Sequence, residues 1–234
     1  MGVDVVFVLS GFLVGRILVR DLVRDGWLHA GRFYVRRAFR IFPAYWLVLT
    51  LVLVATANGI TGAWPLLFGT SDSSVLRSLA WENYLYVANY LQPTKGVTLM
   101  SWAWSLCVEE HFYLLLPPLL WTIFRFARPA ARLPVIVVIG LLPLAGRFLQ
   151  HRADPSLRPV DGFYFMSHNR FDELFLGVVV AYLDVVHGPA LARACSRWKH
   201  ALLPAGLALV ALAWARGGVL HASGAFPVVW QYSA

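Results

Sequence analysis

The residues best suited to chemistry are two adjacent carboxylates, Glu109 and Glu110, at the start of a long apolar run. A carboxylate in such surroundings needs a partner or a watered cavity to offset its desolvation. Adjacent helical positions point about 100° apart, so the two groups cannot share one role. Glu109 falls in line with Ser105 and Tyr113 at steps of four residues, and we expect it to face the interior. The alternative is a structural ion pair with an arginine of a neighbouring helix.

Metal chemistry is not predicted. Glu110 precedes His111, but no second histidine follows at the spacing that a zinc-binding helix requires. The two cysteines, Cys107 and Cys195, lie in an apolar run and in a basic stretch, and they show no metal-ligand spacing.

A third carboxylate, Asp4, stands near the start of the first apolar run. On a helix it shares one face with Val8, Gly11 and Gly15, and such a row of small residues allows close packing against a second helix. An ionisable side chain at membrane depth is a functional candidate. The alternative is a packing helix with Asp4 near its outer end.

Arginines recur at helical spacing before the second apolar run. Arg32, Arg36 and Arg40 are four residues apart, and Arg37 lies beside them. Guanidinium groups recognise phosphate bidentately, so this row could bind a polyphosphate at a membrane surface. The alternative is ordinary anchoring of a membrane helix by positive charges on its cytoplasmic side.

A fourth charged segment holds Arg170 and Glu173. These residues are three positions apart, so on a helix they are neighbours that neutralise each other. His168 beside them is a lone histidine, for which an interfacial position is expected rather than a role as ligand or base.

The elements that must position these groups are membrane helices. Of the 234 residues, 59% are hydrophobic and only 14% charged, a composition unlike that of water-soluble domains. The predicted fold is an all-α polytopic transmembrane bundle forming a single membrane domain over residues 1–234. The stretch 64–100, rich in Trp, Tyr and Asn, is predicted to be an interfacial or re-entrant loop. Six spans are predicted, at approximately 3–19, 41–58, 103–124, 133–150, 171–187 and 200–215.

The formal net charge of +8 is explained by arginines between the apolar runs, so nucleic-acid binding is not expected. Placing the basic groups 16–40, 125–132 and 193–199 in the cytoplasm gives the predicted orientation. The group within 147–170, which includes Arg147 and Arg170, disagrees with it.

In combination, four segments resemble the integral-membrane acyltransferase 3 family, the O-acyltransferases of bacterial surface polysaccharides, lipooligosaccharide and some macrolides. The family pattern G-V-D-x-F-F-V-L-S-G-F corresponds to Gly2 to Phe12, and F-Y-x-R-R-x-x-R-I-x-P to Phe33 to Pro43. The pattern W-S-L-x-V-E-E-x-F-Y-L corresponds to Trp104 to Leu114, and R-x-D-x-L-x-x-G to Arg170 to Gly177. Order and spacing also suit the family.

The resemblance implies a multi-pass protein of the bacterial cytoplasmic membrane. It would move an acyl group, commonly acetyl, from acyl-CoA to a hydroxyl of a carbohydrate or macrolide-like acceptor, with no bound cofactor. Arg36, Arg37 and Arg40 would hold the phosphates of the acyl donor. Glu109 and Asp4 would line the buried path in supporting roles. A transporter of a glycan or lipid and a non-catalytic relative are the alternatives, and further residues that could line a path are Ser105, Glu110, Tyr113 and Arg170.

The family carries an Arg and a general-base His on a helix ahead of the G-V-D segment, and it usually has about ten spans. Nothing in this sequence corresponds to that helix. We therefore expect the sequence to be a piece of a longer protein that lacks the first helix and the C-terminal helices.

Overall fold

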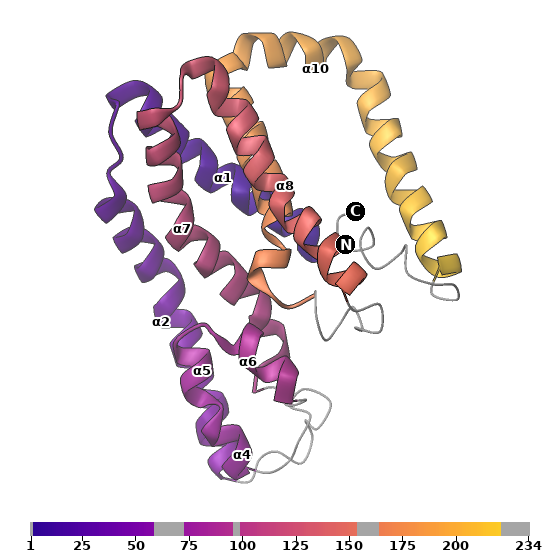
Figure 1. Cartoon of the computed structure of the whole chain (residues 1–234). Coiled ribbons are helices and arrows are strands. Elements are labelled where there is room, and N and C mark those ends of the chain that lie inside the picture. The colour runs from indigo at the N-terminus through magenta and orange to yellow at the C-terminus, as the bar shows by residue number, and fades with distance from the viewer. Residues whose placement is uncertain (1, 59–72, 96–98, 154–163, 221–234) are drawn as a thin grey trace. The chain divides into compact units, whose positions relative to one another are not determined.

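The computed structural model describes residues 2–58, 73–95, 99–153 and 164–220 (Figure 1). These ranges contain helices and turns and no strand, which confirms the predicted all-α class. Within them, three helices are long and apolar enough to cross a membrane, namely Ala30–Ala57, Pro129–Ala153 and the Phe171–Trp198 part of a longer helix.

The six predicted apolar spans lie within long helices, to within one residue at their ends, but the spans and the helices do not correspond one to one. The last two runs, 171–187 and 200–215, belong to one helical stretch that kinks at His187, where φ is −122° and ψ is 23°. Gly188 and Pro189 follow, and proline is tolerated in the first turn of a helix because its missing N–H has no partner there. The basic stretch 193–199, expected between two spans, is therefore helical. The long helices are α1 (Gly2–Asp25), α2 (Ala30–Ala57), α7 (Trp104–Phe126), α8 (Pro129–Ala153) and α10 (Phe171–Leu220).

The predicted loop 64–100 contains three short helices, α4 (Ser73–Ser78), α5 (Ala80–Tyr84) and α6 (Ala88–Lys95). A fourth short helix, η1 (Ser101–Ala103), leads into α7. Aromatic packing joins this segment to α2, since the rings of Tyr45 and Tyr86 stack with centroids 4.7 Å apart. Burial raises the pKa of the Tyr86 hydroxyl, which stays neutral. Residues 59–72 and 96–98 lie outside the described part, and the interfacial position stays a prediction.

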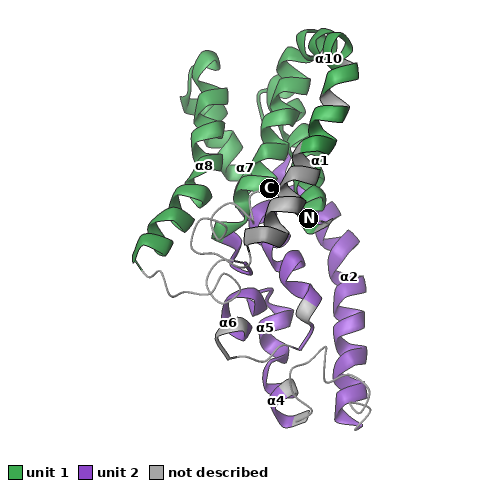
Figure 2. Cartoon of the chain, turned by 90° about the vertical axis from the view of Figure 1, so that its right-hand side faces the viewer, with its two compact units in different colours: residues 1–28, 116–159, 168–234 green, residues 29–115, 160–167 purple. Residues whose placement is uncertain are grey.

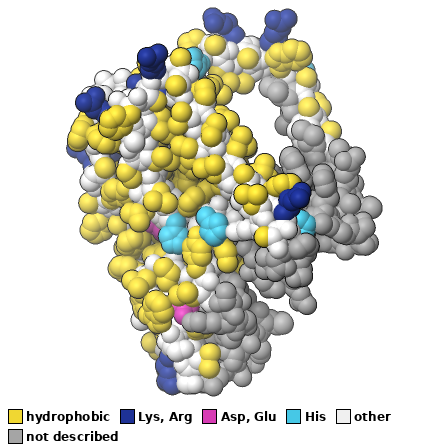
Figure 3. Space-filling model, viewed as in Figure 1, with side chains coloured by type: hydrophobic (Ala, Val, Ile, Leu, Met, Phe, Trp, Pro, Cys, Tyr) yellow, Lys and Arg dark blue, Asp and Glu magenta, His cyan; other side chains and the backbone are white. Residues whose placement is uncertain are grey.

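The chain divides into two compact units (Figure 2). Unit 1 comprises residues 1–28, 116–159 and 168–234, and unit 2 comprises residues 29–115 and 160–167. Large apolar side chains are exposed along the long helices of both units, and hydrophobic atoms dominate the face in Figure 3. Such surfaces suit a lipid environment.

In unit 1, α1 and α10 cross at the predicted row of small residues. A Cβ at Gly11 would collide with the carbonyl oxygen of Leu174, and one at Gly177 would collide with the carbonyl oxygen of Val8. A Cβ at Gly15 would lie 3.1 Å from Cα of Val178, which is tighter than an ordinary van der Waals contact. The glycines therefore let two backbones touch, which confirms the close packing expected for this face of α1.

Candidate functional site

A buried guanidinium holds the start of α1 to the start of α10 within unit 1. The Arg170 side chain is fully buried and forms an ion pair with Asp4 of α1. Its Nη1 also lies 3.1 Å from Oε1 of Glu173, one turn along α10. The Arg170–Glu173 pairing predicted from the spacing is confirmed, and Asp4 is a third member of the cluster.

A second buried arginine ties α8 to the same end of α10. Arg147 contacts both carboxylate oxygens of Asp172, at 3.1 and 2.6 Å, and it donates to the backbone carbonyl of Asn169. Its side chain is 1% exposed. The assignment of Arg147 and Arg170 to a positively charged loop is therefore wrong, because both guanidiniums neutralise carboxylates inside unit 1. These two arginines therefore no longer argue against the predicted orientation.

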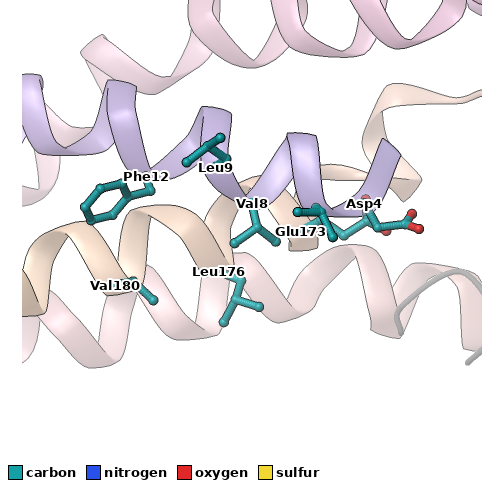
Figure 4. Close-up of a pocket in the computed structure, with 8 residues that line it drawn as sticks. Asp4, Val8, Leu9, Phe12, Glu173, Leu176 and Val180 are labelled. Carbon is teal, nitrogen blue, oxygen red and sulfur yellow. The ribbon is translucent and has the colours of Figure 1, made fainter. Parts of the chain in front are cut away.

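The start of the α1–α10 crossing borders a groove of about 520 Å³ (Figure 4). Asp4 and Glu173 lie at one end of it, and the other lining residues are apolar. This combination of an apolar concavity with a few polar groups is the usual form of a small-molecule site.

Unit 2 holds the second candidate site, around Glu109 of α7. Tyr113 donates its hydroxyl to Oε2 of Glu109 at 2.7 Å, one helical turn away. Arg37 of α2 places Nη2 3.8 Å from the same oxygen, and its guanidinium carbon lies 3.6 Å above the Tyr113 ring. The side chains of Arg37 and Glu109 are only 17% and 14% exposed. Glu109 thus has the arginine partner that the structural alternative requires, and a carboxylate held in this way is also well oriented.

The other predicted residues of unit 2 are placed around this cluster. Arg36 and Arg40 are exposed on α2 and form no ion pair with the residues that the structure describes, and Arg32 is exposed in the same way. Glu110 is partly buried, and its Oε1 has no hydrogen-bond partner within the described ranges. Ser105 donates to the carbonyl of Trp102 at 3.3 Å. The row of Ser105, Glu109 and Tyr113 therefore brings Tyr113 to Glu109, whereas Ser105 bonds to the backbone carbonyl of Trp102.

A polar trio that sequence reasoning missed also lies in unit 2. Nδ1 of His111 is 2.6 Å from Oγ of Ser167, and the Asn89 amide donates to that same oxygen at 2.8 Å. The serine oxygen accepts from Asn89 and can either donate to the imidazole or accept from it, so Ser167 joins the two side chains whichever nitrogen of His111 carries the proton. These residues are 22 and 56 positions apart along the chain, so no local spacing could reveal them. His168, the histidine singled out in the sequence, is exposed on η2 (Ser167–Asn169).

We predict that Ser167→Ala destabilises the protein, because it leaves the buried Asn89 amide and His111 Nδ1 without their shared partner. The expected loss is about 1–3 kcal/mol in the free energy of unfolding, the usual penalty for orphaned buried polar groups. Ser105→Ala is the control, since among the described residues that hydroxyl bonds only to the nearby carbonyl of Trp102. Denaturant unfolding in detergent micelles measures both, and equal stability of the two variants would contradict a structural role for the trio.

Within the described ranges, no three His, Cys, Asp or Glu side chains converge as metal ligands would. The fold and the two charged clusters define a helical membrane protein whose ionisable groups are held inside apolar helices.

Comparison with known proteins shows more specifically which proteins this chain is similar to. The chain is 26% identical over 195 residues to the peptidoglycan O-acetyltransferase OatA of Listeria monocytogenes, and 25% identical over 191 residues to the O-acetyltransferase OatA of Staphylococcus aureus. It is also 29% identical over 188 residues to an uncharacterized protein of Haemophilus influenzae. The predicted resemblance to membrane O-acyltransferases is confirmed by these relatives. No protein-family model matches the chain, and no solved structure matches it.

The matched segments cover 78% of this chain in both OatA alignments and 76% in the Haemophilus alignment. They cover 29% and 30% of the two OatA proteins, and 73% of the Haemophilus protein. The chain thus spans less than a third of the length of the named acetyltransferases.

Proposed function

We propose that this chain belongs to a multi-pass enzyme of the bacterial cytoplasmic membrane that transfers an acyl group, commonly acetyl, from acyl-CoA to a hydroxyl of a cell-surface carbohydrate. The observation that carries the proposal is the similarity to two proteins named O-acetyltransferase. The exposed arginines of α2 and the oriented carboxylate of α7 supply groups suited to the donor and to the reaction.

The reaction converts a thioester and a hydroxyl into an oxygen ester and a thiol. The acceptor hydroxyl oxygen attacks the thioester carbonyl, the carbon–sulfur bond breaks, and the hydroxyl proton leaves with the thiol. A base must take that proton, and in the family that the four motifs resemble this base is a histidine. Asp4 and Glu109 then have supporting roles, in which each carboxylate orients a cationic or donor group.

Of the three arginines predicted to bind the donor, Arg36 and Arg40 are best suited to phosphate. Both guanidiniums are exposed and form no ion pair with described residues. Arg37 instead lies between Glu109 and the Tyr113 ring, where its charge holds the carboxylate. We therefore assign the donor phosphates to Arg36 and Arg40. Arg37 is assigned a different role, as a positioning residue for Glu109.

Replacing Arg36 and Arg40 together by alanine in the full-length protein should raise the KM for acetyl-CoA roughly tenfold, which corresponds to about 1.4 kcal/mol. The value of kcat should change little, because neither residue touches the reacting atoms. Radiolabelled acetyl transfer in membranes measures both constants, and raising the salt concentration should weaken wild-type donor binding more than that of the variant.

Arg77→Ala is the matched control, since Arg77 is an exposed arginine of unit 2 on α4. An unchanged KM in the double variant would contradict phosphate binding by this row. Movement of a glycan across the membrane without thioester consumption would instead identify a transporter, and the absence of both activities would identify a non-catalytic relative.

A further inference from the structure

The groove of unit 1 has a polar end and a long apolar remainder. Figure 4 shows Asp4 and Glu173 together at one end, while the other labelled side chains follow α1 and α10 away from them. Its volume of about 520 Å³ is in the range of sites that hold small molecules. The apolar lining residues are Val5, Val8, Leu9, Phe12, Leu176 and Val180.

Glu173 brings an incompletely satisfied carboxylate to the polar end. The side chain is 6% exposed, and Oε1 lies 3.1 Å from Arg170. Oε2 is buried and accepts no hydrogen bond from any residue that the structure describes. A buried acceptor without a donor is costly, so a ligand that supplies an O–H group here would gain that hydrogen bond.

The charges at this end are paired with one another. Arg170 forms an ion pair with Asp4 and also lies against Glu173. The nearby Arg147 is paired with Asp172. A phosphate would therefore find only guanidiniums that already have a carboxylate partner, and a cationic headgroup would be repelled by the guanidinium between Asp4 and Glu173. A neutral headgroup with hydroxyls avoids both costs.

The apolar walls are open on the side from which a hydrocarbon chain would enter. Val5 is 69% exposed, and Leu9 and Leu176 are 54% and 55% exposed. In a membrane protein, such side chains meet lipid, so a chain can slide into the groove from the bilayer without crossing water.

We propose that the α1–α10 groove binds a neutral amphiphile whose hydrocarbon chain lies along the apolar walls and whose hydroxyl-bearing headgroup donates to Glu173. Alkyl glycosides belong to this chemical class. The proposal is supported by the groove and by the buried Glu173 carboxylate, and it does not depend on the proposed acyl transfer.

The test uses the full-length protein in phosphatidylcholine nanodiscs and a dodecyl glucoside that carries a photoreactive diazirine in its chain. Mass spectrometry locates the labelled peptides, which we expect to be in α1 and in the first turns of α10. Leu9→Trp fills the groove and should reduce labelling roughly tenfold. Leu13→Trp is the matched control, because Leu13 is on the same helix, is 52% exposed and does not line the groove.

The headgroup is tested with two further probes that have the same chain, a dodecyl phosphate and a dodecyl trimethylammonium. Both should label these helices roughly tenfold less than the glucoside does. Equal labelling by all three probes, preferred labelling by either ion, or equal loss in Leu9→Trp and Leu13→Trp would each overturn the proposal.

Discussion

Replacing Arg170 by methionine is expected to prevent the protein from accumulating in its folded form. The substitution leaves Asp4 and Glu173 facing each other, with Glu173 almost fully buried and without a cation. Removing one partner of a buried ion pair costs about 3–5 kcal/mol, most of it from the charge that is left behind. That loss is comparable to the whole stability of many domains, about 5–15 kcal/mol.

The experiment compares the folded yield and thermal unfolding of three proteins in the same detergent. Arg16→Met is the control, because the Arg16–Asp184 pair joins the same two helices but its side chains are 39% and 32% exposed. An exposed pair is worth about 0–1 kcal/mol, so this variant should remain folded. Equal yields of Arg16→Met and Arg170→Met would contradict the buried-charge argument.

A compensated variant separates charge from shape. Asp4→Asn and Glu173→Gln introduced together with Arg170→Met remove all three charges and keep similar volumes. Replacing a complete buried ion network by neutral groups is often tolerated, so the triple variant should recover much of the folded yield that the single variant loses. A triple variant that is no better than Arg170→Met would show that Arg170 acts through packing instead.

The sequence predicts the Arg170–Glu173 pair of this cluster but not the contact between Arg170 and Asp4. The spacing of Arg170 and Glu173 is enough to pair them on a helix, and the structure has that pair. Asp4 is 166 positions away, so its contact with Arg170 depends on which helices pack together. Apolar periodicity finds the helices but does not say how they pair.

Arg147 shows a different limit. Counting positive charges between apolar runs treats each arginine near the end of a run as a surface charge. Arg147 lies inside α8 and its charge is neutralised by Asp172, which comes 25 positions later. The rule fails here because it depends on exposure, which the sequence of a single helix does not determine.

The site around Glu109 was anticipated in part. The four-residue spacing correctly aligns Glu109 with Tyr113, because that contact lies within one helix. The approach of Arg37 was foreseen only as an arginine of some neighbouring helix, and the trio of His111, Ser167 and Asn89 was not foreseen. Contacts between helices depend on tertiary packing that periodicity does not encode.

The second large effect on folding is expected at Gly177, where α10 crosses α1. Gly177→Leu is expected to abolish the α1–α10 contact, because even its Cβ would overlap the carbonyl oxygen of Val8, and it would lie 2.5 Å from the backbone nitrogen of Phe12. Backbone atoms cannot rotate away as a flexible side chain can, so the helices must separate. Separation would also pull Asp4 from Arg170 and expose the Arg170–Glu173 pair without its third member.

The clash predicts a graded series, measured as folded yield and as unfolding temperature. Gly177→Ala should already destabilise the protein strongly, and Gly177→Leu should leave no folded protein, since every added atom moves the backbones further apart. Gly206→Ala, on the same helix with no heavy atom near the new Cβ, should be neutral or stabilising by up to about 1 kcal/mol, because alanine favours helix over glycine. If Gly177→Ala instead behaved like Gly206→Ala, the two backbones would not be in contact, and the close crossing that brings Asp4 to Arg170 would have to be abandoned with it.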